Sequence, residues 1–205
     1  CLNEKKCPPQ VKGKIEHFIG RKAMDIDGLG AETIDALVET GLIKNISDLY
    51  SLTYDQVVSL ERMADKSTRN LLMGLETSKN VPFEKVLFGL GIRFVGETVS
   101  KKLAKEFKQM DAIIHASYEE LVLTDEIGEK IARSITNHFQ DEENIDLVNR
   151  LKQAGLCFEK EHSDLDSVLL EGLTLVISGT FNLFSRDEIK KMIEINWGKN
   201  SSSIS

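Results

Sequence analysis

Residues 90–99 read Leu90-Gly91-Ile92-Arg93-Phe94-Val95-Gly96-Glu97-Thr98-Val99, and a triplet within them recurs along the chain. Four such triplets begin at positions 28, 62, 94 and 126, at intervals of 34, 32 and 32 residues. Each has an apolar middle residue and ends in Gly or Ala: Gly28-Leu29-Gly30, Arg62-Met63-Ala64, Phe94-Val95-Gly96 and Glu126-Ile127-Gly128. Because chance rarely keeps such a phase over about 100 residues, the repeat predicts a tandem array of one structural unit.

Apolar and small residues follow each triplet at fixed distances. A large aliphatic lies nine residues past each start (Leu37, Leu71, Leu103 and Ile135), and the residue six past is small in three of the four units (Ile34, Thr68, Ser100 and Ala132). This pattern predicts a helix, a tight turn whose middle residue fills the space between helices, and a second helix. The first N–H groups of a helix have no intrahelical partner, so with the helix dipole each unit offers an anion site.

Outside the triplets, the sequence predicts short helices, followed by a polar linker and a strand. Capping-box spacing, Ser or Thr followed three residues later by Gln or Glu, predicts helix starts at Thr53, Ser117 and Ser185, and Gly41 and Gly155 stand where helices should end. Residues 159–171 are polar and predict a linker, and Leu173-Thr174-Leu175-Val176-Ile177 predicts a buried strand with a helix from Ser185. One strand and one helix cannot complete a sheet, so we expect residues 172–205 to be part of a larger domain.

Composition limits the class of protein. The 205 residues are 41% hydrophobic and 29% charged, which suits packed cores in one large or two small domains. No apolar run approaches the roughly 18 residues of a membrane span. Three cysteines favour a reducing compartment over a disulfide framework. The first residues are no signal peptide and include no initiating Met, so we expect a piece of a longer, cytoplasmic protein.

Charge is distributed unevenly. The net charge is −7, but residues 79–110 carry seven basic and three acidic residues, whereas residues 111–171 carry five basic and fifteen acidic ones. Since charges separated by more than about 8 Å are screened at physiological salt, a basic face can attract phosphate although the whole chain is acidic.

The repeat resembles the helix-hairpin-helix arrays of nucleic-acid enzymes. More narrowly, the chain is similar over its whole length to the C-terminal half of bacterial NAD-dependent DNA ligases. The strings that carry the resemblance are residues 7–18 (CPPQVKGKIEHF), 21–30 (RKAMDIDGLG), 90–99 (LGIRFVGETV) and, like the start of a BRCT domain, 173–205 with Ser178-Gly179-Thr180-Phe181. The resemblance implies a mainly α fold: a zinc-finger remnant at 1–10, four hairpins over 11–158, the linker, and a truncated α/β BRCT-like segment at 172–205.

The resemblance also implies the DNA-binding residues. In this family the hairpins grip nicked duplex DNA through phosphate contacts, which position a protein without reading sequence. The matching backbone positions and the side chains expected beside them are Gly28, Leu29, Gly30, Gly96 and Gly128, with Lys66, Ser67, Arg93, Thr98, Lys101, Lys102, Lys105 and Lys130. The first and third hairpins are the expected contacts, because Arg62, Ala64 and Glu126 replace glycines in the second and fourth. The alternative is that the hairpins only pack against one another.

The family's cofactors are NAD, Mg²⁺ and Zn²⁺. Cys1 and Cys7 match the second half of its four-cysteine zinc site, and because structural zinc needs four ligands we expect no zinc bound by this pair alone. Adenylation by NAD belongs to an upstream domain, so we assign no catalytic residue and expect this fragment to be inactive alone, binding its upstream domains and no membrane. The competing interpretations are a hairpin tail of another DNA-repair protein and a helical protein-interaction module built on the acidic block.

Overall fold

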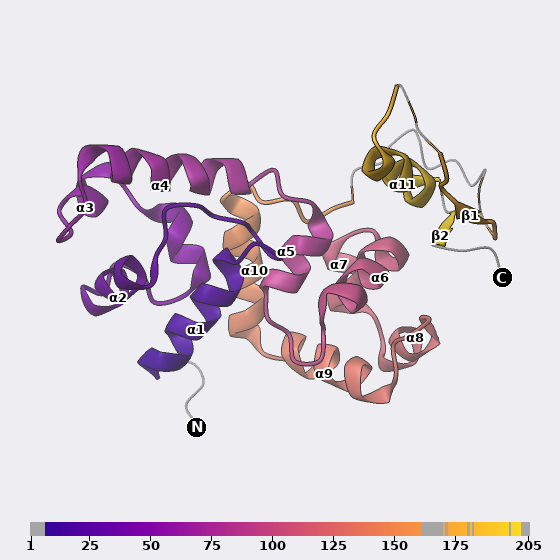
Figure 1. Ribbon diagram of the computed structural model, residues 1–205. Helices are drawn as coiled ribbons and strands as arrows, with labels where there is room; N and C mark the ends of the chain where they lie inside the picture. Colours follow the sequence, from indigo (N-terminus) through magenta and orange to yellow (C-terminus); the bar gives the residue numbers. More distant parts are fainter. Residues whose placement is uncertain are drawn as a thin grey trace. The chain divides into compact units, whose positions relative to one another are not determined.

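The computed structural model describes residues 7–160, 170, 172–179, 181, 183–196 and 198–201. The chain divides into two compact units, Cys1–Lys160 and Glu161–Ser205. The first unit is helical (Figure 1). Its elements are α1 (Pro8–Ile19), α2 (Ala31–Glu39), the 3-10 helix η1 (Ile46–Ser51), α3 (Tyr54–Val58), α4 (Asp65–Ser78), α5 (Phe83–Gly89), α6 (Glu97–Phe107), α7 (Met110–His115), α8 (Tyr118–Leu123), α9 (Glu129–Phe139) and α10 (Glu142–Gln153).

Every recurring triplet lies in a tight turn that leads directly into a helix. The first residue of each has a left-handed backbone: Gly28 at φ 88°, Arg62 and Phe94 at 67°, and Glu126 at 66°. The last residue of each is the extended N-cap of the following helix, namely Gly30 for α2, Ala64 for α4, Gly96 for α6 and Gly128 for α9. Three of the four turns therefore hold a side-chain-bearing residue in a conformation that favours glycine.

The periodic residues of the repeat form the core of the first unit. The middle residues Leu29, Val95 and Ile127 are buried, while Met63 is partly buried and packs against the core. The residues six and nine past each start are all buried: Ile34, Thr68, Ser100 and Ala132, and Leu37, Leu71, Leu103 and Ile135. The apolar stripe and the small positions thus lie inside the unit, as the spacing predicts.

Neighbouring turns are held by the helices of the next repeat. Gly28 packs on α4, where a Cβ would lie 3.2 Å from the Cα of Leu71. In the second half, the hydroxyl of Ser134 in α9 donates to the carbonyl oxygen of Arg93 at 2.6 Å. The second helix of an even-numbered repeat therefore supports the turn of the preceding odd-numbered one in both halves.

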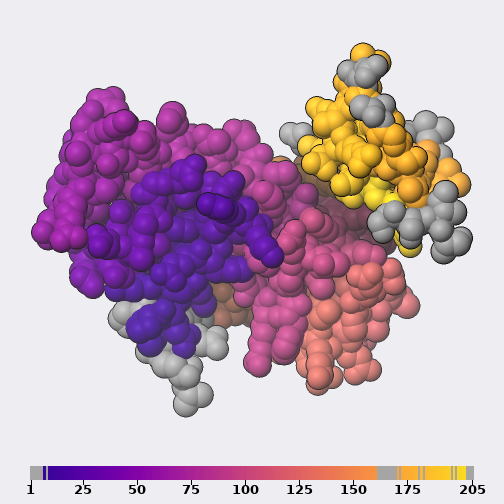
Figure 2. Space-filling model, in the orientation of Figure 1, coloured from indigo at the N-terminus to yellow at the C-terminus, as the bar shows by residue number. Residues whose placement is uncertain are grey.

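The two halves of the first unit meet through α1 and α5. The Nε2 atom of His17 lies 2.9 Å from the carbonyl oxygen of Phe88, and the two rings are 4.7 Å apart. In the space-filling view, the indigo and purple surface of the first half is continuous with the magenta surface of the second (Figure 2). The first and third turns consequently belong to one packed body.

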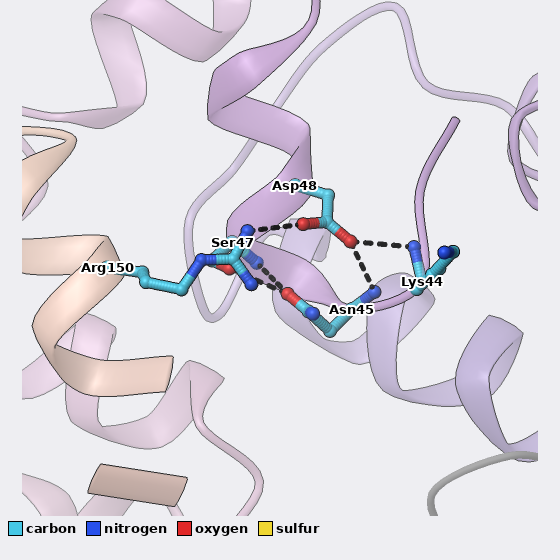
Figure 3. A network of polar contacts seen from close by, with 5 residues as sticks. All are labelled: Lys44, Asn45, Ser47, Asp48 and Arg150. Atoms are coloured by element: carbon cyan, nitrogen blue, oxygen red, sulfur yellow. Dashed lines mark hydrogen bonds and ion pairs between the residues drawn. The ribbon is translucent and has the colours of Figure 1, made fainter. Parts of the chain in front are cut away.

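Helix α10 ties its own end of the chain to η1. Asp48 of η1 accepts hydrogen bonds from the backbone N–H groups of Lys44 and Asn45, and Arg150 of α10 donates to its other oxygen at 2.5 Å (Figure 3). Asn45 accepts in turn from Ser47, which closes a capping box at the start of η1. A helix that follows the fourth repeat thereby fixes the linker between the first and second.

The predicted helix signals are confirmed. Thr53, Ser117 and Ser185 each cap a helix through a complete capping box. Gly41 and Gly155 follow helix ends with φ values of 73° and 94°.

The second unit holds β1 (Thr174–Val176), α11 (Arg186–Ile195) and β2 (Lys199–Ser201). The strands pair in parallel, with Leu175 opposite Asn200. The strand β1 lies inside the predicted strand, but its residues are exposed or half-buried, not fully buried. The sequence did not predict β2, because Lys-Asn-Ser has neither the alternation nor the β-branched residues of a strand. Most of the predicted linker, together with Thr180, lies outside the described residues.

Candidate nucleic-acid interface

The helices that follow the four turns begin without a side-chain cap. Neither Gly30, Ala64, Gly96 nor Gly128 can supply one, whereas α3, α8, α10 and η1 all begin with a side chain that accepts a backbone hydrogen bond. Helices α1, α5 and α7 also lack a side-chain cap, but they begin after Cys7, Pro82 and Gln109 and not after a glycine or alanine.

Backbone N–H groups at these helix starts face outward. In α6 the first N–H group to donate to the N-cap residue is that of Ser100, which lies 2.9 Å from the carbonyl oxygen of Gly96. Within residues 7–160, no hydrogen bond to the protein is found for the N–H groups of Glu97, Thr98 and Val99, nor for the corresponding groups of α2 and α4. In α9 the third group is engaged, because the N–H of Ile131 donates to Gly128 at 3.0 Å. The fourth turn therefore offers fewer donors than the first three.

Space for a ligand exists at three of these N-caps. Gly30, Gly96 and Gly128 are exposed, and a Cβ at any of them would have no protein atom within 4 Å. Gly28 differs, because its close contact with Leu71 leaves no room for a side chain. The Leu29 side chain is buried, so at this predicted position only the backbone is available for contact.

An acidic residue stands in the first turn of every one of these helices. The residues are Glu32 in α2, Asp65 in α4, Glu97 in α6 and Glu129 in α9. The Lys101 ammonium holds the pKa of Glu97 below its usual value, and the Tyr54 hydroxyl followed by Arg69 does the same for Asp65. Negative charge on Glu97 and Asp65 therefore competes with any incoming phosphate, which the glycine pattern alone did not anticipate.

Ion pairs connect the turns in a row. Arg62 of the second turn meets Glu32 at the start of α2 at 3.0 Å, and Lys22, which precedes the first turn, lies 3.7 Å from Glu97 at the start of α6. Lys102 of α6 contacts Glu126 of the fourth turn at 3.3 Å. The order along the surface is therefore second, first, third and fourth turn.

The predicted cations fall into two groups. Lys101 pairs with Glu97, and Lys102 pairs with Asp125 and Glu126, which raises the pKa of Lys102. Lys66, Arg93 and Lys130 are exposed and form no ion pair within the described part of the unit. Ser67 and Thr98 are exposed beside the free N–H groups of α4 and α6.

Of the predicted zinc ligands, only Cys7 falls within the described residues, while Cys1 lies outside them. Cys7 is the N-cap of α1 and has a free, partly buried thiol. Among the described residues no three His, Cys, Asp or Glu side chains gather as a metal site. His17 is engaged with the Phe88 carbonyl. None of the described helices has the length and apolar character needed to cross a bilayer.

Comparison with known proteins matches this geometry. The family model described as helix-hairpin-helix motif matches residues 85–148, which contain the third and fourth turns. The chain is 54% identical to a DNA ligase of Phocaeicola vulgatus and 56% identical to one of Bacteroides fragilis, each over 207 aligned residues. A DNA ligase of Porphyromonas gingivalis is 46% identical. All three alignments cover 100% of this chain and 31% of the relative's length. The chain is therefore homologous, along its whole length, to a segment amounting to about a third of a bacterial DNA ligase.

Proposed function

We propose that residues 7–160 bind double-stranded DNA without sequence preference, through phosphates held at the starts of α2 and α6. The observation that carries the proposal is the set of uncapped, exposed helix starts behind Gly30 and Gly96. Each offers three outward N–H groups at the positive end of a helix dipole, which is a favourable environment for an anion. Contacts of this kind go to the DNA backbone, so they are insensitive to base sequence.

The arrangement of the turns supports simultaneous contact by the first and third. They belong to one packed body through α1 and α5, and Lys22 bridges them by its ion pair with Glu97. Arg93 adds an exposed positive charge at the third turn, and Lys66 adds one at the second. We place the fourth turn at the edge of the interface, since it has fewer free N–H groups and the acidic Glu126.

The activity of the whole protein is part of the same proposal. We infer that it is an NAD-dependent ligase that seals nicks in bacterial DNA during replication and repair, in the cytoplasm and on the nucleoid. NAD and Mg²⁺ would act on a catalytic domain outside this chain. Cys1 and Cys7 would supply two thiolates to a four-ligand zinc site, for which Cys7 at a helix N-cap is a chemically suitable donor.

The parallel pair β1–β2 with α11 packed beside it fits the start of an α/β domain. On this basis we retain the assignment of residues 172–205 as part of a BRCT-like domain. Its exposed apolar residues, including Leu183 and Phe184, are consistent with an incomplete core.

Fluorescence anisotropy of the 205-residue chain with a labelled nicked duplex tests DNA binding. If about four phosphates are neutralised, log K should fall against log salt with a slope of roughly −3.6 between 50 and 200 mM salt. Two duplexes of unrelated sequence should give the same curve. The absence of saturable binding at 50 mM salt would refute the proposal and favour a protein-interaction module.

A further inference from the structure

Phe94 exposes a large aromatic side chain at the tip of the third turn. It is 54% exposed, and its backbone is left-handed at φ 67°. The guanidinium carbon of Arg93 lies over its ring, 4.9 Å from the centroid. An exposed ring with a cation on one face is a combination that stacks on nucleic acid.

The third turn differs here from the other three. The corresponding positions hold Gly28, Arg62 and Glu126, none of them apolar. A bulky side chain is poorly suited to a left-handed backbone, and a glycine at this position would remove that strain. The backbone of the turn therefore gives no reason for a phenylalanine at this position.

The turn fixes the backbone on both sides of Phe94. The carbonyl of Arg93 on one side accepts from Ser134 at 2.6 Å, and Val95 on the other side is buried in the core. The N–H of Val95 also donates to Ile92 at 3.0 Å. Since both neighbours are fixed, the backbone that carries Phe94 has little freedom to lose when a partner binds.

We propose that Phe94 and Arg93 form a stacking pair that packs against the sugar and base edges of the DNA groove, next to the phosphate held at the start of α6. This proposal rests on the DNA binding proposed above and adds an apolar contact to it. The free N–H groups begin three residues after Phe94, at Glu97, so a phosphate bound there brings the adjoining nucleotides close to the ring.

The surroundings favour DNA over a protein partner. The other large apolar side chains exposed within residues 7–160 are aliphatic (Met73, Val122 and Leu123), whereas Phe94 is aromatic, cation-capped and adjacent to an anion site. An aromatic beside a guanidinium and uncapped amides matches the mixed apolar and anionic surface of a nucleic acid.

Anisotropy with the nicked duplex tests the pair, using Phe94→Gly, Arg93→Gln and, as an exposed apolar control, Leu123→Ala. Phe94→Gly should weaken binding about tenfold at every salt concentration, because it removes an apolar contact with the groove while leaving the ionic contacts in place. Arg93→Gln should also make the salt slope shallower by about 0.9. Leu123→Ala should bind like the unsubstituted chain.

Thermal unfolding separates contact from folding. Phe94→Gly should melt at or above the temperature of the unsubstituted chain, since it relieves the left-handed strain. If the unsubstituted chain binds DNA and Phe94→Gly binds equally well, the stacking pair is wrong while the proposed function stands. If the unsubstituted chain does not bind, both are wrong.

Discussion

Gly74, in the middle of α4, lies directly against the backbone of Asp27, so that a Cβ at position 74 would stand 2.8 Å from the Asp27 carbonyl oxygen. This contact brings the second helix of one repeat onto the turn of the repeat before it. The turn that ends at Gly30 is therefore shaped by a residue 44 positions further along the chain.

Gly74→Ala should destabilise the first unit by about 1–3 kcal/mol, because the new methyl group overlaps a backbone oxygen that cannot move without shifting the turn. The matched control is Gly13→Ala in α1, where no atom lies within 4 Å of the added Cβ. That control should stabilise the protein by about 0.5–1 kcal/mol through helix propensity. Urea unfolding of both variants measures the difference, and equal midpoints would contradict the close contact.

Gly96→Val should abolish most DNA binding while lowering stability by no more than about 1 kcal/mol. Gly96 has an extended backbone and open space at its Cβ, so valine fits, but its methyl groups cover the amides of α6. Gly28→Val is the contrasting variant and should unfold the turn, since φ is 88° and Leu71 is 3.2 Å away. Anisotropy and thermal unfolding, measured on both variants, separate loss of DNA binding from loss of folding. A parallel loss of helicity and binding in Gly96→Val would indicate that the turn only packs.

Glu97→Gln should strengthen DNA binding about two- to fivefold at low salt. The carboxylate stands in the first turn of α6, where it opposes a phosphate, and it holds Lys22 and Lys101 in ion pairs. Glu142→Gln at the start of α10 is the control, since this helix is capped by Asp141 and lies outside the repeat. Unchanged or weaker binding by Glu97→Gln would mean that its carboxylate does not face the DNA.

Asp48→Ala should cost more stability than Arg150→Met. Asp48 accepts from two backbone N–H groups, one exposed and one partly buried, as well as from Arg150, so its removal opens the capping box of η1 and should destabilise by about 1–2 kcal/mol. Arg150→Met removes only the partly exposed ion pair and should cost about 1 kcal/mol. A double-mutant cycle in urea gives the coupling between the two side chains. A coupling near zero would show that α10 does not hold η1 through this pair.

The stability of the first unit should rise with pH between about 4 and 6.5. Burial, followed by the positive charge of Lys14, lowers the pKa of His138 from 6.5 to about 4, while Asp141 opposes the shift. The unfolded chain therefore binds a proton in this range that the folded chain does not. This contribution to the free energy of unfolding is fully present above pH 6.5. As the pH falls towards 4, up to about 3 kcal/mol of it is lost. Unfolding midpoints of the chain and of His138→Gln across this range test it, and a similar acid slope in both would exclude His138 as the cause.

The sequence by itself determined the repeat and its consequences. A spacing of 32 to 34 residues, an apolar middle residue and a small third residue were enough to predict four turns, the buried positions that follow them and the glycine N-caps. These features are local, because a tight turn and an amphipathic helix depend on residues within about ten positions of each other. The match of the family model to residues 85–148 covers the last two turns, and the helix-hairpin-helix character of the first two remains a prediction.

Only the tertiary structure decided which side chains are available at the surface. Lys102 looked equivalent to Arg93 as a DNA contact, yet folding places Asp125 and Glu126 against it and leaves Arg93 exposed over Phe94. The same is true of Gly74 against Asp27, of Arg150 at Asp48, and of the strand β2 that pairs with β1. The physical reason is that these contacts join residues 23 to 102 positions apart, whose partners are set by how helices pack and not by any local periodicity.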